Sequence, residues 1–165
     1  ASARAKPPPP PYVDARFSFE VRIPPGWSIP PSPTLPPFPR PALVWALHNK
    51  KTRELAVVTR VVGPTDLLHV DASVLDDLEA QFRARASNYR RVSRRRLDLG
   101  AGRRRHPALD LWFSARDGNK REVSVGVRFI FFPGYILALS VDSPGRRSSR
   151  DAKQLVDTFR PSLPR

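Results

Sequence analysis

Arginines carry the clearest chemical signal in this sequence. Ten of them lie between residues 83 and 105, where Asp98 is the only acidic residue. A guanidinium group binds a carboxylate or a phosphate through two parallel hydrogen bonds, so such a surface can dock an acidic protein, lipid headgroups or nucleic acid. The alternative is a solvated surface without a dedicated partner. The arginines that we expect to bind a partner are Arg94, Arg96, Arg103, Arg104 and Arg105.

The strand pattern predicts where these arginines point. Residues 95–99 are predicted to form a strand, in which Leu97 and Leu99 face inward while Arg94 and Arg96 face outward. Residues 103–105 are expected in the turn that follows, beside the outward-facing pair.

Catalytic and metal-binding chemistry has little support in the sequence. His48, His69 and His106 are far apart along the chain, and none has the spacing of a motif such as H-E-x-x-H. The chain has no cysteine, which excludes disulfides, thiolate metal sites and a cysteine nucleophile. We therefore expect a protein that is not an enzyme and that has no metal, no cofactor and no small-molecule substrate.

The overall charge predicts acidic partners. The chain has 29 Lys and Arg against 15 Asp and Glu, a formal net charge of +14. Such a charge favours an acidic protein surface, an anionic membrane or nucleic acid, although an arginine-rich proteome would give the same balance. Nucleic acid is not favoured, because Tyr89 is the only aromatic residue among the arginines and no helix-turn-helix or zinc-finger pattern is present.

Proline divides the chain into an arm and a body. Fourteen of the twenty prolines lie within residues 1–41. Residues 1–11 are predicted to form an extended arm, since a run of five prolines adopts polyproline II. A second proline-rich segment, residues 30–41, is predicted as a loop. Either segment is a spacer or a strap against a partner, and the residues expected to make that contact are Pro8, Pro9, Pro10, Leu35 and Phe38.

The first residues also suggest a compartment. The small side chains of residues 1–5 resemble the region around a signal-peptidase site. We therefore expect an extracytoplasmic protein, in a periplasm, a lumen or at a cell surface, that can lie peripherally on a membrane.

Residues 12–165 are predicted to form one α+β domain, an antiparallel sheet with helices packed on it. The strand at residues 17–23 alternates apolar and polar side chains and ends at Pro24-Pro25-Gly26. A helix at residues 74–86 is expected to start with a capping box at Ser73 and Asp76. Further strands are expected at residues 42–48, 54–62, 95–99, 108–116, 121–132 and 135–142, and a last helix at residues 149–159.

Three segments resemble the Mog1/PsbP-like family. They are Phe17-Ser18-Phe19 through Pro25-Gly26-Trp27, then residues 102–115, and finally Ser140-Val141-Asp142 with the helix that ends at Phe159-Arg160-Pro161, where Thr158 replaces the usual serine. The resemblance covers about residues 12–161. It implies a sandwich of sheet and helices and a non-enzymatic module: an accessory subunit of a photosynthetic complex, a GTPase-binding factor, a periplasmic lipoprotein or a chaperone for effector helices. No functional residue of the family can be transferred.

The function that we expect is an accessory or scaffolding subunit of a larger assembly. The alternative is a chaperone-like adaptor that binds an apolar segment of a secreted client. An exposed apolar groove near Trp45 and Trp112 would support this alternative, whereas we expect both tryptophans to pack under a helix on the second face of the sheet.

Overall fold

The computed structural model describes residues 11–30, 42–62, 70–101 and 103–162. The proline-rich segments predicted at residues 1–11 and 30–41 therefore lie almost entirely outside the described residues. In chain order the elements are β1 (Tyr12–Asp14), β2 (Phe19–Val21), β3 (Ala42–Asn49), β4 (Glu54–Val62), α1 (Ala72–Arg85), β5 (Ser87–Ala101), β6 (Arg104–Arg116), β7 (Glu122–Phe132), β8 (Tyr135–Pro144), α2 (Arg150–Thr158) and β9 (Arg160–Pro161).

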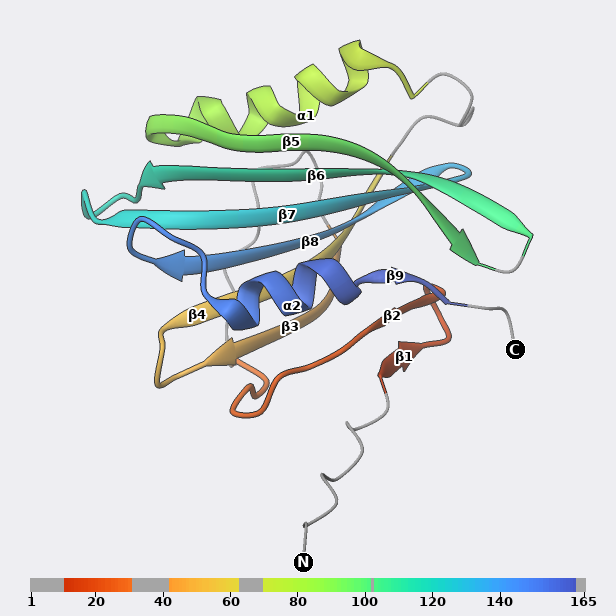
Figure 1. Ribbon diagram of the computed structural model, residues 1–165, viewed down its shortest axis with the longest axis horizontal. Helices are drawn as coiled ribbons and strands as arrows, with labels where there is room; N and C mark the ends of the chain where they lie inside the picture. The colour runs from red at the N-terminus through yellow and green to blue at the C-terminus, as the bar shows by residue number, and fades with distance from the viewer. Residues whose placement is uncertain (1–10, 31–41, 63–69, 102, 163–165) are drawn as a thin grey trace, which may run out of the picture.

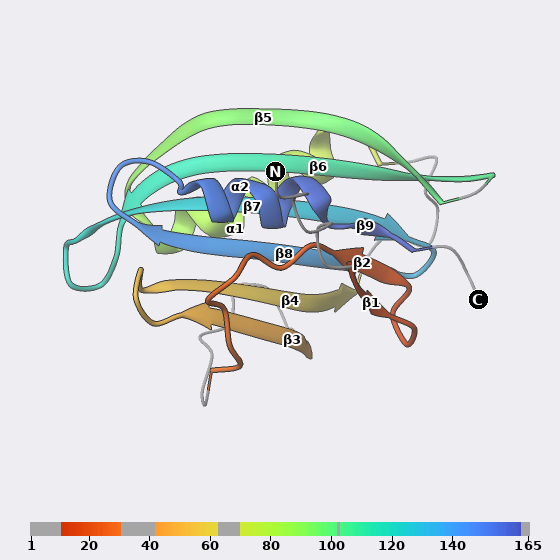
Figure 2. The same cartoon turned by 60° about the horizontal axis from the view of Figure 1, so that its bottom comes forward.

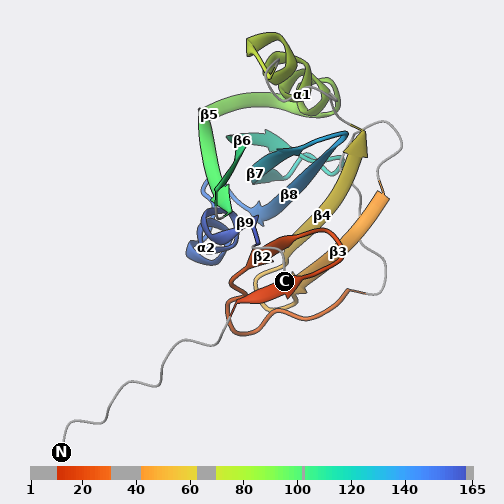
Figure 3. The same cartoon turned by 90° about the vertical axis from the view of Figure 1, so that its right-hand side faces the viewer.

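A six-stranded sheet forms the centre of the molecule. Its strands run in the order β3-β4-β8-β7-β6-β5, and every neighbouring pair is antiparallel. A small sheet of β1, β2 and β9 accompanies it. Helix α1 lies on one face of the large sheet, whereas α2 and the small sheet lie on the other (Figures 1 and 3). The predicted α+β architecture, with helices packed on an antiparallel sheet, is confirmed.

Each face of the large sheet has its own hydrophobic core. Successive side chains of a strand point to opposite faces, so β7 sends Phe129 to the α1 side and Ile130 to the α2 side. On the α1 side, Leu75, Leu78 and Phe82 of the helix pack on β6 and β7, as their spacing predicts. On the α2 side the core contains Phe19, Val21, Leu137, Leu139, Leu155, Val156 and Phe159.

The first strand is shorter than predicted. Phe19 and Val21 are fully buried, as the alternation requires, but β2 covers only residues 19–21. Ser18 has a φ of 56°, a left-handed conformation that interrupts the strand. The chain turns there, and β1 pairs with β2 as a short hairpin.

Helix α1 begins earlier than predicted, and its cap is a different residue. Asp71 is the N-cap, and its Oδ1 accepts hydrogen bonds from the backbone N–H groups of Ser73 at 3.0 Å and Val74 at 3.3 Å. The predicted capping box at Ser73 and Asp76 was therefore wrong. Helix α2 matches its prediction closely, with Ser149 as N-cap and Phe159 as C-cap.

Strand β5 differs most from its prediction. It has 15 residues instead of the five predicted, and it forms one edge of the large sheet. The register against β6 shifts twice, between Ser87 and Arg90 and between Arg91 and Ser93, so β5 carries two bulges. Because β6 begins at Arg104, only Arg103 of the predicted arginine turn lies in the turn itself.

A buried ion pair fixes α2 to the sheet. The Arg128 guanidinium donates to both carboxylate oxygens of Asp110, at 2.6 and 2.8 Å. Its third nitrogen donates to the backbone carbonyls of Asp157 and Phe159 at the end of α2, at 3.1 and 3.0 Å. These contacts hold the helix along the central strands (Figure 2).

Candidate functional site

The β5–β6 hairpin extends beyond the rest of the sheet. Strand β6 pairs with β7 only from Ala108 onward, whereas its pairing with β5 continues to the Ala101–Arg104 pair. Residues 98–101 and 104–107 are thus a two-stranded projection, visible at the right of Figure 1 and again in Figure 2. Arg103, Arg104 and Arg105 are exposed near its tip. We call Arg96 and these three residues the arginine ribbon.

His106 anchors the base of this projection. It is buried, its ring lies 4.6 Å from the ring of Phe132, and its Nδ1 is 3.2 Å from the backbone carbonyl of Phe131. Burial lowers the pKa of His106. The hydrogen bond to Phe131 acts to raise this pKa and the charge of Arg104 lowers it, and the net effect is a lowered pKa. The ring is therefore neutral at pH 7, and Nδ1 donates to the carbonyl. This contact positions the ribbon on the edge of the core.

Strand alternation divides the ribbon between two faces. Arg105 is the cross-strand partner of Gly100, and its Nη1 would lie 2.8 Å from a Cβ at that glycine. The Arg105 side chain therefore lies across Gly100, in the space that a side chain at position 100 would occupy. Arg104 points to the opposite face because it is the next residue in the strand.

Arg94 does not face outward as predicted. Its side chain is 22% exposed, and its Nη1 donates to Asp76 at 2.6 Å and to Glu79 at 3.0 Å, both on α1. The side chain belongs to the face that α1 covers, because Arg94 pairs with the buried Leu111 of β6. Arg94 therefore holds the helix to the sheet.

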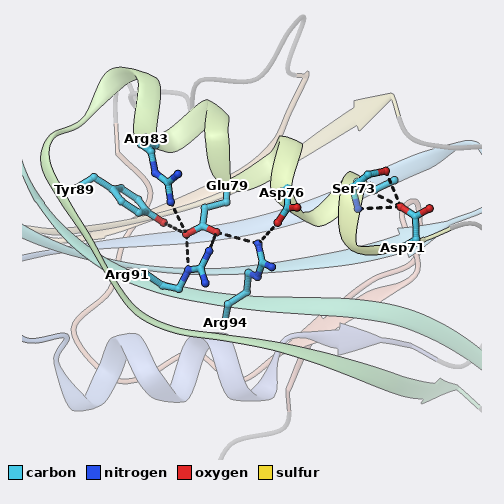
Figure 4. Close-up of polar contacts among 9 residues, drawn as sticks. Asp71, Ser73, Asp76, Glu79, Arg83, Tyr89, Arg91 and Arg94 are labelled. Carbon is cyan, nitrogen blue, oxygen red and sulfur yellow. Dashed lines mark hydrogen bonds and ion pairs between the residues drawn. The ribbon is translucent and has the colours of Figure 1, made fainter.

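Glu79 is the centre of this polar network (Figure 4). Its side chain is 3% exposed and receives hydrogen bonds from the Tyr89 hydroxyl and the Arg91 Nε, each at 2.7 Å. The Arg91 Nη2 also donates to Glu79, and the Arg83 guanidinium lies 3.6 Å from the carboxylate. Four cationic or hydroxyl side chains thus converge on one buried carboxylate, and all come from α1 or from β5.

The network changes two pKa values. Burial acts to raise the pKa of Glu79, but the hydrogen bonds from Arg91 and Tyr89 and the charges of Arg91 and Arg94 outweigh it and lower the pKa to about 2. Burial and the hydrogen bond to Glu79 raise the pKa of Tyr89 far above its ordinary value. At pH 7 the carboxyl is ionised and the phenol is neutral, which is the state that these hydrogen bonds need.

The predicted partner-binding residues therefore divide into three groups. Among the described residues, no acidic group lies within ion-pair distance of the arginine ribbon. Arg94 is taken up by α1. The last group lies outside the described residues and stays a prediction: Pro8, Pro9, Pro10, Leu35 and Phe38.

Sequence reasoning missed Glu79 as a partner of the arginines. Glu79 lies four residues after Leu75 and three before Phe82. That spacing puts Glu79 on the buried stripe of α1. A buried carboxylate needs a cationic partner, so the position of Glu79 on an apolar stripe would have predicted that an arginine binds it.

The described histidines do not form a catalytic or metal-binding group. His48 lies on β3 and His106 on β6, at opposite sides of the sheet order, and His69 is outside the described residues. Within the described part of the chain no cluster of three potential metal ligands occurs. None of the described helices is long and apolar enough to cross a membrane.

The two tryptophans pack on the α2 side of the sheet, but Trp45 lies against β1 and β2 of the small sheet and not under a helix as predicted. Trp45 and Trp112 are partly buried against the core of that face. The Trp45 ring stacks on Tyr12 at 5.4 Å, so the surface near Trp45 is not an open groove. Trp112 lies over Gly126, where a Cβ would be 2.3 Å from the ring.

Comparison with solved structures identifies the fold. A solution structure of cyanobacterial PsbP (CyanoP) from Synechocystis is 13% identical and superposes with a TM-score of 0.60, covering 98% of this chain and 97% of that one. The chain has a Mog1/PsbP-like fold. The Saccharomyces cerevisiae Ran-binding protein Mog1p is 12% identical, with a TM-score of 0.53 over 91% of this chain and 93% of that one. A Mog1 variant is 11% identical, with a TM-score of 0.55 over 91% and 94% of the two chains.

These identities are far below the level at which function can be transferred. No protein-family model and no curated protein sequence matches the chain. The Mog1/PsbP-like fold is thus established by structure, and the resemblance that the short motifs predicted is confirmed at that level.

Proposed function

We propose that this chain is a non-enzymatic accessory or scaffolding subunit that docks an acidic surface of a larger assembly through the arginine ribbon. The observation that carries the proposal is the ribbon itself: four exposed arginines without an acidic partner among the described residues, three of them on the part of the β5–β6 hairpin that projects from the sheet. Arginine is well suited to this role, since its planar fork binds carboxylates in a bidentate manner.

The contrast with Arg91 and Arg94 supports the proposal. Those two arginines have carboxylate partners on α1, and their positions are explained by the fold. Arg103, Arg104 and Arg105 have no carboxylate partner in the described part of the chain, so they are free to bind the carboxylates of the partner that we propose. A net charge of +14 would also steer such a partner toward the chain.

The relatives in fold are consistent with a binding role. One is a Ran-binding protein and another is a cyanobacterial PsbP protein. We further propose that the assembly is extracytoplasmic and can lie against an anionic membrane, and that the proline-rich arm and loop form a strap along it. The proline-rich residues support the strap, and the net charge of +14 supports contact with an anionic surface.

The chaperone-like adaptor is the weaker alternative. It requires an apolar groove near both tryptophans, and Tyr12 stacks on Trp45. Among large apolar side chains in the described residues, those that are exposed are scattered: Tyr12, Ile29, Leu43 and Val92.

A pull-down with charge-reversed variants tests the proposal. The test variant changes Arg103, Arg104 and Arg105 to Glu, and the control changes Lys50, Lys51 and Arg53 to Glu. Both sets are exposed, both alter the net charge equally, and they lie at opposite ends of the sheet (Figure 1). Native extracts are passed over each immobilised protein at low salt and again at about 0.5 M salt, where screening is stronger.

The expected result is one defined acidic partner that binds the unmodified chain and the control at low salt, binds the ribbon variant at least tenfold less, and is released by salt. Equal recovery on the control and the ribbon variant would refute docking through the ribbon. Recovery of no specific partner at low salt would refute the accessory-subunit proposal as a whole.

A further inference from the structure

A cleft separates α2 from the edge strand β5 on the face opposite α1. It has a volume of about 430 Å³ and is lined by residues of β5, β6, α2 and the β8–α2 connection. Helix α2 packs on β7 and β8, so it leaves the β5 side of this face uncovered (Figure 2). The volume lies in the range of small-molecule pockets, about 300–1,000 Å³, so the cleft has room for a large side chain.

The cleft contains an apolar surface. The half-buried Trp112 ring and the Val92 side chain line it. Val92 is 70% exposed, because it is the extra residue of a bulge between Arg91 and Ser93 and therefore has no cross-strand neighbour. Trp112 is held in place by Gly126, whose missing side chain makes room for the ring. The cleft thus offers a rigid aromatic surface and an exposed aliphatic residue to a partner.

The rim of the cleft is cationic. Arg146, Arg147 and Lys153 line it, against a single acidic residue, Asp157. Arg146 is engaged by Glu122 at 2.9 Å. Arg147 and Lys153 are exposed, and no acidic partner lies within ion-pair distance of either among the described residues. The site therefore combines an apolar centre with two available cations.

We propose that this cleft binds an extended acidic segment of the partner protein, which inserts one apolar side chain of Leu or Phe size beside Trp112. Carboxylates on either side of that side chain reach Arg147 and Lys153. The inference rests on the proposed function, since it describes how the same acidic partner is anchored. The cleft borders β5, the strand that leads into the arginine ribbon, so one partner can contact both.

The contribution of the apolar side chain to affinity distinguishes this proposal from a purely electrostatic contact. Two fluorescein-labelled nonapeptides serve as probes: eight glutamates around a central phenylalanine, and the same peptide with a central serine. Their affinities are measured by fluorescence anisotropy on the full chain, and the indole N–H resonance of Trp112, assigned through Trp112→Phe, reports the place of binding. We expect the phenylalanine peptide to bind about tenfold more tightly and to shift that resonance.

Matched variants separate the two contributions. Val92→Ser should abolish the preference for phenylalanine, whereas Leu43→Ser, an exposed apolar residue on the opposite edge strand, should preserve it. Lys153→Glu should weaken the binding of both peptides. Because Val92, Leu43 and Lys153 are all exposed, these changes leave the fold intact.

Other outcomes overturn the proposal in distinguishable ways. One such outcome is that both peptides bind with equal affinity, that the Trp112 resonance does not move, and that Arg104→Glu abolishes the binding. This outcome would exclude the cleft and leave docking through the ribbon standing. Binding of neither peptide would also exclude the cleft, because its chemistry must accept this probe. The pull-down with the ribbon variant then decides the proposed function independently.

Discussion

Replacing Glu79 by Gln tests the physical account of the α1–β5 network most directly. The substitution keeps the shape of the side chain but removes the charge that Arg91 and Arg94 neutralise. A carboxyl whose pKa is lower in the folded chain than in the unfolded chain stabilises the fold above its unfolded pKa, and this contribution is lost as the pH falls through the folded pKa.

The magnitude follows from the two pKa values. A fall from about 4.3 in the unfolded chain to about 2 in the folded chain corresponds to about 3 kcal/mol at pH 7. The same relation leaves about 1.4 kcal/mol at pH 3. The side chain is 3% exposed, so solvent screening reduces this value little. We therefore expect Glu79→Gln to lower the free energy of unfolding by about 3 kcal/mol at pH 7 and by about half of that at pH 3.

Urea unfolding followed by tryptophan fluorescence, at several pH values between 7 and 3, measures both quantities. Asp76→Asn is the matched control, because Asp76 binds the same Arg94 but is 62% exposed. An exposed ion pair contributes at most about 1 kcal/mol. A loss below about 1 kcal/mol for Glu79→Gln at pH 7, or a loss that does not change with pH, would refute the reasoning.

Three further predictions concern other buried groups, each measured by urea unfolding. Burial raises the pKa of Asp142 from 3.8 to about 6, so its ionisation opposes folding increasingly as the pH rises from the unfolded to the folded pKa. Asp142→Asn should therefore stabilise the chain by about 3 kcal/mol at pH 7 and by less than about 1 kcal/mol near pH 4, and an equal effect at both would contradict the shift. Gly126→Ala places a Cβ 2.3 Å from the Trp112 ring and should cost about 1–3 kcal/mol with a red-shifted emission; unchanged stability and emission would show that the ring is free to move. Arg128→Met leaves the buried Asp110 with only the exposed Arg95, 3.7 Å away, and should cost about 3–5 kcal/mol, most of it recovered when Asp110→Leu is added. A double variant as unstable as the single one would argue against a poorly compensated buried charge.

Alternation and periodicity were sufficient to predict most of the core. The strands with continuous apolar alternation, such as β6, β7 and β8, were placed within a few residues of their ends. Helical spacing likewise places the apolar residues of each helix on its buried face: Leu75, Leu78 and Phe82 of α1, and Ala152, Leu155 and Val156 of α2. The spacing of apolar residues predicts these elements because it shows which face of a strand or helix is buried, without knowledge of the contacts that the face makes.

The elements that were missed are held by polar contacts between distant residues. Strand β5 extends to Ser87 because it pairs with β6, although its residues 87–96 show no apolar alternation. The engagement of Arg94 depends on Asp76 and Glu79, which precede it by 18 and 15 residues. No local pattern specifies which carboxylate an arginine will meet, so the sequence overestimated the number of arginines available to a partner.

The bulged edge strand has a consequence for self-association. An edge strand presents unpaired N–H and C=O groups on which a second copy could extend the sheet, and bulges and charged residues oppose such extension. Strand β5 has both, with two bulges and the arginines 90, 91, 94, 95 and 96 within ten residues. Two copies brought edge to edge would place these cations against each other. The β5 edge is therefore protected from pairing with a second copy of the chain.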